Sequence, residues 1–104
     1  MREITSVEFT NEVARSPGRT VVDFYSEGCG PCRLVSPFLE QIERENTGQV
    51  KVLKVDAANA PELVTQYNIQ AVPTIMLFID GQWRSQLVGA RSKRDLQRWI
   101  LETN

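Results

Sequence analysis

The sequence contains no histidine and only two cysteines among its 104 residues. Without histidine, neither a Ser-His-Asp nor a Cys-His catalytic centre can form, and no metal site with histidine ligands can be built. Two cysteines also fall short of the four thiolates that a structural zinc site needs within one chain. These absences exclude two broad groups, the histidine-dependent hydrolases and the small zinc domains.

An excess of charge and long apolar runs are absent as well. Twelve Lys and Arg face thirteen Asp and Glu, a net charge of −1, so we expect no binding to nucleic acid or to a membrane surface. The longest apolar run, residues 75–79, is too short to cross a bilayer. Residues 1–11 lack the apolar core of a secretory signal. These features predict a soluble, cytoplasmic protein.

The length and composition are those of one globular domain. The chain is 41% hydrophobic and 24% charged, close to the average for soluble proteins. We see no linker, repeat or low-complexity segment, and 104 residues suffice for a single core. Residues 1–104 are therefore expected to form one domain.

The order of the hydrophobic patterns predicts an α/β fold. Short runs rich in β-branched and aromatic residues predict buried strands, and stretches with helical periodicity separate them. The predicted strands are residues 21–25, 50–55 and 74–79, and the predicted helices between them are residues 32–46 and 61–67. Helices between strands are typical of parallel βαβ units.

The two ends of the chain add different elements. Residues 7–15 are predicted to form a short helix, and Asp80-Gly81 predicts a tight hairpin turn. Beyond the turn, Trp83, Ser85 and Leu87 alternate with polar residues, as in an edge strand with one wet face. A final helix capped by Ser92 presents Leu96, Trp99 and Ile100 to the core. The result is an α/β sandwich with a mixed sheet.

The two cysteines lie in one motif, Cys29-Gly30-Pro31-Cys32, between a predicted strand and the long helix. Two cysteines in a small domain can be inert core residues, or half of a zinc site shared between two chains. The C-x-x-C spacing at a helix start, with no other sulfur partner, instead favours a redox-active pair.

The first turn of a helix suits a reactive sulfur. Its unpaired amide groups and the positive end of its dipole stabilise a thiolate, which is the form that attacks disulfides. Pro31 stiffens this turn, and Arg33 adds positive charge, whereas Glu27 acts in the opposite direction. We predict that Cys29 is the exposed nucleophile and Cys32 the resolving thiol.

Asp23 stands within the apolar strand that leads to the motif. Burial is costly for a carboxylate and raises its pKa, so an acid under the two thiols could carry the proton of Cys32. Asp23 could instead end the strand in water or form a structural pair with a lysine. Lys54, the cation of the neighbouring predicted strand, is its expected electrostatic partner.

Val72-Pro73-Thr74 precedes the third predicted strand. The spacing of these residues does not indicate the isomer of the peptide bond before Pro73, and a strand start is the simplest interpretation.

Taken together, these segments resemble the thioredoxin family over nearly the whole chain. The matching segments are Val22-Asp23-Phe24-Tyr25, Cys29-Gly30-Pro31-Cys32-Arg33, Pro37, Lys54-Val55-Asp56, Tyr67-Asn68-Ile69, Val72-Pro73-Thr74, Phe78, Asp80-Gly81 and Val88-Gly89-Ala90. The resemblance implies a thioredoxin fold, a central mixed sheet of about five strands flanked by about four helices. It also implies a thiol–disulfide oxidoreductase that reduces protein disulfides, an electron carrier with no cofactor other than the Cys29–Cys32 pair.

The resemblance further assigns roles to single residues. Asp23 would carry the proton with help from Lys54, and Pro73 would be cis and face the disulfide. The substrate-binding surface would consist of Gly28, Gly30, Pro31, Val72, Pro73 and Gly89, with no metal. The implied partners are a thioredoxin reductase, linked to NADPH or to ferredoxin, and disulfide-containing target proteins. The protein would act as a monomer.

The chain departs from the family pattern beside the motif. Gly28 stands where the family usually has Trp, and Tyr25 replaces another frequent Trp. Loss of an aromatic wall predicts an altered substrate range and redox poise with the exchange chemistry intact. Two alternatives remain: a thioredoxin-fold binding module whose redox activity is incidental, and a zinc clasp between two chains at Cys29 and Cys32.

Overall fold

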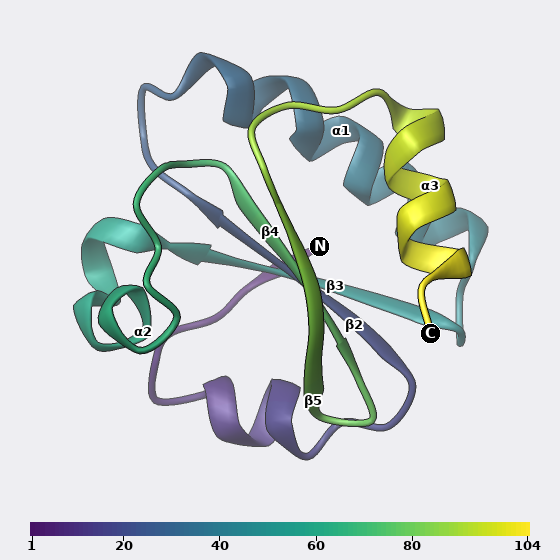
Figure 1. Cartoon of the computed structure of the whole chain (residues 1–104), viewed down its shortest axis with the longest axis horizontal. Helices are drawn as coiled ribbons and strands as arrows, with labels where there is room; N and C mark the ends of the chain where they lie inside the picture. Colours follow the sequence, from purple (N-terminus) through teal and green to yellow (C-terminus); the bar gives the residue numbers. More distant parts are fainter.

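A mixed five-stranded sheet forms the centre of the computed structural model, which describes residues 1–104 (Figure 1). Its strands lie in the order β1-β3-β2-β4-β5, with β1, β3 and β2 parallel and with β4 antiparallel to both β2 and β5. The strands are β1 (Arg2–Glu3), β2 (Arg19–Tyr25), β3 (Val50–Asp56), β4 (Thr74–Ile79) and β5 (Gln82–Val88). The predicted mixed sheet is confirmed.

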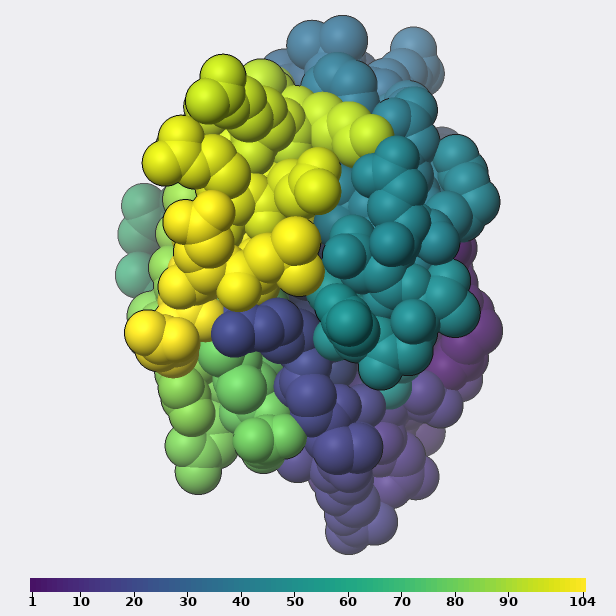
Figure 2. All heavy atoms as spheres, turned by 90° about the vertical axis from the view of Figure 1, so that its right-hand side faces the viewer, coloured from purple at the N-terminus to yellow at the C-terminus, as the bar shows by residue number.

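Helices cover both faces of the sheet. The elements are η1 (Thr10–Ala14), α1 (Gly30–Glu45), η2 (Ala57–Asn59), α2 (Pro61–Gln66) and α3 (Lys93–Glu102). Helices α1 and α3 pack on one face and lie side by side in Figure 2, whereas η1 and α2 pack on the other. The chain is thus a three-layer α/β/α sandwich, as the α/β prediction requires.

Each face of the sheet has its own core of buried apolar residues. Under α1 and α3 lie Val21, Val35, Leu39, Ile42, Val50, Val52, Ile75, Leu77, Leu96 and Ile100. Under η1 and α2 lie Ile4, Phe9, Val13, Val22, Phe24, Leu53, Val55, Ala60, Leu63, Met76 and Phe78. The central strands supply residues to both sets, which explains their continuous apolar runs.

Several local predictions are confirmed by backbone geometry. Asp80 and Gly81 both have positive φ, 51° and 82°, as a type I′ hairpin requires. The hydroxyl of Ser92 accepts a hydrogen bond from the amide of Asp95 at the start of α3. The long helix begins at Gly30, two residues before its predicted start, with Cys29 as its N-cap.

The first predicted helix, residues 7–15, is wrong in length. The helix η1 covers only Thr10–Ala14, preceded by Phe9 in helical geometry. Its turn is wide, because the amide of Arg15 donates to the carbonyl of Thr10. Val7 is 88% exposed, so the apolar stripe that faces the core begins only at Phe9. A helix from residue 7 would have had no buried face to stabilise its first turn.

The predicted alternation in β5 is also wrong. The pairing register shifts between Phe78, which faces Trp83, and Leu77, which faces Ser85. This bulge leaves Arg84 without a partner and moves Trp83 to the opposite face of the sheet from Ser85. Trp83 is consequently 47% exposed.

Candidate active site

The start of α1 holds the two sulfur atoms. Cys29 is the N-cap residue, and its Sγ accepts a hydrogen bond from the amide of Cys32 at 3.2 Å. Cys29 and Cys32 form a disulfide, with their Cα atoms 5.3 Å apart. The helix therefore offers its unpaired amide groups and the positive end of its dipole to Cys29 Sγ.

The two sulfur-bearing residues differ in exposure. Cys29 is half-buried, whereas Cys32 is only 4% exposed and packs beneath the first turn of α1. Gly30 and Pro31, between them, are exposed on the outside of that turn. A large partner can therefore approach Cys29 far more easily than Cys32.

The loop before β4 lies against Cys29. The Sγ atom of Cys29 is 3.8 Å from the carbonyl oxygen of Val72, and the Val72–Pro73 peptide bond is cis, as the resemblance implied. The amide of Gly89 donates to the carbonyl of Pro73 at 2.8 Å, and Gly89 has a φ of 89°. The structure thus brings Val72, Pro73 and Gly89 to the same surface as the accessible sulfur.

Asp23 lies in β2, beneath the start of α1. Its side chain is 2% exposed, and Oδ1 has no hydrogen-bond partner. Burial raises the pKa of Asp23 to about 7, although the positive charge of Lys54 acts to lower it. A carboxyl group with this pKa can both release and take up a proton near neutral pH.

Lys54 stands beside Asp23 in the adjacent strand. The two residues are register partners in the parallel β2–β3 pair. They form no ion pair, and the Lys54 ammonium instead lies 5.5 Å from the centre of the Tyr25 ring. Lys54 thus acts on Asp23 through its field and not through a direct contact.

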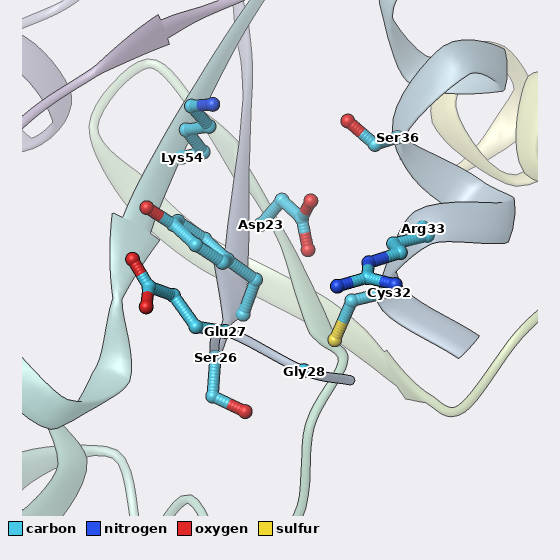
Figure 3. A pocket seen from close by; sticks show the side chains of 9 residues that line it. Asp23, Ser26, Glu27, Gly28, Cys32, Arg33, Ser36 and Lys54 are labelled. Carbon is cyan, nitrogen blue, oxygen red and sulfur yellow. The ribbon is translucent and has the colours of Figure 1, made fainter. Parts of the chain in front are cut away.

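An open cavity of about 380 Å³ lies in front of Cys32. Figure 3 shows the Cys32 sulfur and the Asp23 carboxyl group pointing into it. The cavity is lined by Asp23, Tyr25, Ser26, Glu27, Gly28, Cys32, Arg33, Ser36 and Lys54. A Cβ placed on Gly28 would meet no atom within 4 Å, so the space beside Gly28 is open.

Sequence reasoning missed one hydrogen bond beside the cavity and one residue that lines it. The hydroxyl of Tyr25 donates to the Glu3 carboxylate of β1 at 2.9 Å, and burial together with this bond raises the pKa of Tyr25 to about 12. No pattern marked the two-residue strand that carries Glu3. Ser36 could have been found, because it follows Cys32 by four residues and therefore lies on the same side of α1.

The structure contains neither a group of side chains suited to bind a metal ion nor a helix suited to span a membrane. Nowhere do three or more His, Cys, Asp or Glu side chains gather in a way that could bind a metal ion. No helix is long and apolar enough to cross a membrane.

Known proteins match this chain over nearly its full length. A family model described as Thioredoxin matches residues 1–102. A thioredoxin of Rickettsia typhi is 36% identical over 100 residues, which cover 96% of this chain and 95% of that protein. A thioredoxin 1 of Synechococcus elongatus is 41% identical over 93 residues, which cover 89% and 87%. A thioredoxin of Pseudomonas aeruginosa is 33% identical over 97 residues, which cover 93% and 90%.

Proposed function

Because the chain belongs to the thioredoxin family and is a thiol–disulfide oxidoreductase, we propose that it carries electrons from a reductase to target proteins by cycling Cys29 and Cys32 between dithiol and disulfide. One observation carries this proposal: Cys29 is the N-cap residue of α1, and its Sγ accepts a hydrogen bond from the Cys32 amide at 3.2 Å. That position stabilises a thiolate near neutral pH.

Cys29 is the nucleophile of the proposed cycle. Its thiolate attacks one sulfur of a target disulfide, and the other target sulfur leaves as a thiolate. Cys32 then attacks Cys29 Sγ, which closes the Cys29–Cys32 disulfide and releases the second target sulfur. The half-buried position of Cys29 and the burial of Cys32 support this division of roles.

Asp23 is the proposed proton carrier for Cys32. It accepts the proton when Cys32 becomes a nucleophile and returns it when the disulfide is reduced. Its pKa of about 7 and its place in the cavity that Cys32 also lines support this role. Lys54 assists by stabilising the carboxylate, because its charge opposes the effect of burial.

The proposed substrate-binding surface surrounds the accessible sulfur. An extended target segment would lie along the Val72 backbone beside Pro73, and Gly89 would leave room for the target's main chain. The exposed residues Gly30 and Pro31, together with Gly28, would border the same segment. Exposed backbone groups suit partners of varied sequence, since main-chain contacts do not depend on side-chain identity.

The proposed setting is a reducing compartment. The Cys29–Cys32 disulfide must be reduced again after each turnover, which requires a reductase linked to NADPH or to ferredoxin. Because thiols are kept reduced in the cytoplasm, we place the protein there. Residues 1–104 act in this proposal as one domain and as a monomer, without a metal or other cofactor. A single sheet shared by all strands supports the one-domain assignment.

Reduction of insulin tests the proposed function. With dithiothreitol as electron donor, the protein should accelerate the precipitation of reduced insulin, and exchange of both cysteines for serine should abolish the effect. Candidate NADPH- and ferredoxin-linked reductases then replace dithiothreitol. A protein that fails with dithiothreitol is not a disulfide reductase. If the double serine variant keeps the biological role, the protein acts as a binding module.

A further inference from the structure

Three charged side chains around the cavity have no ion-pair or hydrogen-bond partner, and Lys54 contacts only the face of the Tyr25 ring. Glu27, Arg33 and Lys54 all line it, yet none of these side chains forms an ion pair or a hydrogen bond within the chain. At the inner wall, the Asp23 carboxyl group is 2% exposed and its Oδ1 is likewise unpartnered. A carboxyl group this deeply buried normally finds a hydrogen-bond partner, so Asp23 Oδ1 is available to a group that enters the cavity.

The arrangement of these groups defines the chemistry of a ligand. Two cations, Arg33 and Lys54, suit carboxylate groups, and Glu27 suits an ammonium group. A volume of about 380 Å³ is in the range of small-molecule sites and too small for a folded partner. An amino acid or short peptide with both carboxylate and ammonium groups fits this description.

The Cys32 sulfur faces the same cavity (Figure 3). Cys29 does not line the cavity, and its sulfur lies against the Val72 carbonyl oxygen instead. A thiol bound in the cavity therefore meets Cys32 Sγ first. Attack at this sulfur also has the better leaving group, because the departing Cys29 thiolate is stabilised by the Cys32 amide and the start of α1.

We propose that the cavity beside Gly28 binds a small zwitterionic thiol, such as a cysteine-containing short peptide, and gives it direct access to Cys32. The inference rests on the proposed dithiol–disulfide cycle and adds a second route for electrons to it. Proteins exchange electrons at Cys29, and small thiols exchange them at Cys32.

The exchange balances in two steps. A thiolate RS⁻ attacks Cys32 Sγ, the Cys29–Cys32 bond breaks, and its electron pair leaves on Cys29 Sγ. A second RS⁻ attacks the ligand sulfur of the Cys32–SR mixed disulfide, releasing RSSR and the Cys32 thiolate. Each thiolate of the protein then takes a proton. One protein disulfide and two RSH molecules thus give one dithiol and one RSSR.

Single-cysteine variants separate the two routes. In Cys29→Ser, we expect oxidised glutathione, the probe, to form a mixed disulfide at Cys32 with a rate that saturates as its concentration rises. In Cys32→Ser, the same probe should react at Cys29 without saturation. Ser36→Phe, on the cavity wall of α1, should slow the Cys32 reaction at least tenfold and leave the Cys29 reaction within twofold. Mass spectrometry of quenched samples measures both rates.

Matched variants keep the test decisive. Ser36→Ala does not fill the cavity and should leave both rates within twofold. Arg33→Gln should raise the half-saturating concentration of glutathione severalfold but not affect the uncharged probe 2-hydroxyethyl disulfide. Equal slowing of both cysteines by Ser36→Phe, or an unreactive Cys32, would overturn the inference. Reduction of insulin by the two-cysteine Ser36→Phe protein verifies its fold, and failure of the unchanged chain in that assay would refute the proposed function instead.

Discussion

The two sulfur atoms of one disulfide have opposite surroundings. Cys29 is half-buried and lies against backbone groups, with the Val72 carbonyl oxygen 3.8 Å from its sulfur. Cys32 is buried, and its sulfur faces a cavity with charged side chains on its walls and the unpartnered Asp23 carboxyl group inside. Backbone groups accept many partners, whereas a charged cavity selects by size and charge. A single covalent bond therefore presents two different specificities.

Exchange of each cysteine should have the largest effect and tests the comparison directly. We expect both Cys29→Ser and Cys32→Ser to lower insulin reduction to the background rate, since the cycle needs two sulfurs. Only Cys32→Ser should accumulate a mixed disulfide with a protein target, because Cys29 is the proposed nucleophile. Gel analysis under non-reducing conditions measures this species. Accumulation by Cys29→Ser would reverse the two roles.

The next largest effect is expected at Asp23. The pKa of Asp23 is raised from 3.8 to about 7, so the folded state holds this proton more tightly than the unfolded state. Stability should therefore fall as pH rises from about 4 to 7 and stay low above that range. A pKa difference of one unit corresponds to about 1.4 kcal/mol. The difference in unfolding free energy between Asp23→Asn and the unchanged chain should therefore shift in favour of the variant by up to about 4 kcal/mol between pH 4 and pH 8.

Urea unfolding of the oxidised protein at several pH values measures the Asp23 effect. The control is Asp95→Asn, which removes an exposed carboxylate from the first turn of α3 and should show no such gain. Parallel stability curves for the unchanged chain and Asp23→Asn would show that the carboxyl group is not destabilised by burial.

A smaller effect is expected at Gly89 and tests the surface next to Cys29. Gly89→Ala and Gly48→Ala place a side chain at almost the same positive φ, 89° and 87°, so each should lose about 1 to 2 kcal/mol of stability. Only Gly89 lies beside Pro73, so only Gly89→Ala should raise KM for insulin, by a few fold. Equal KM values for the two variants would exclude Gly89 from the binding surface.

The smallest effect is expected at Lys54. Removing its charge in Lys54→Gln should raise the pKa of Asp23 further, because Lys54 lowers it in the native chain. Carbon-detected NMR titration of the carboxyl group measures the shift. Lys51→Gln is the matched control, since Lys51 belongs to the same strand but pairs with Glu12. A downward shift in Lys54→Gln would contradict this electrostatic role.

The sequence was sufficient to predict the central strands and the redox motif. Residues 75–79 form a continuous apolar run, and the predicted strand 74–79 has the same bounds as β4. Cys29 and Cys32 are close in sequence, so a local pattern could place them at a helix start. Strand β1 was not predicted, because its two exposed polar residues are too few to show the hydrophobic alternation of a strand.

Features that depend on several elements at once could not be predicted. The cavity needs walls from β2, β3 and α1, and Gly28, in the loop between β2 and α1, lines it without a side chain. The resemblance correctly implied a cis bond before Pro73, but the contact between Val72 and Cys29 joins segments 43 residues apart. The bulge in β5 follows from pairing with β4, so the alternation of β5 alone predicted the wrong face for Trp83.

That bulge has a consequence for contacts between molecules. Strand β5 borders the sheet, and its outer row of amide and carbonyl groups is open to another strand. Arg84, the extra residue, interrupts this row near its middle and places a charged, exposed side chain there. A neighbouring chain therefore finds no unbroken ladder to extend, and edge-to-edge polymerisation is disfavoured at high protein concentration.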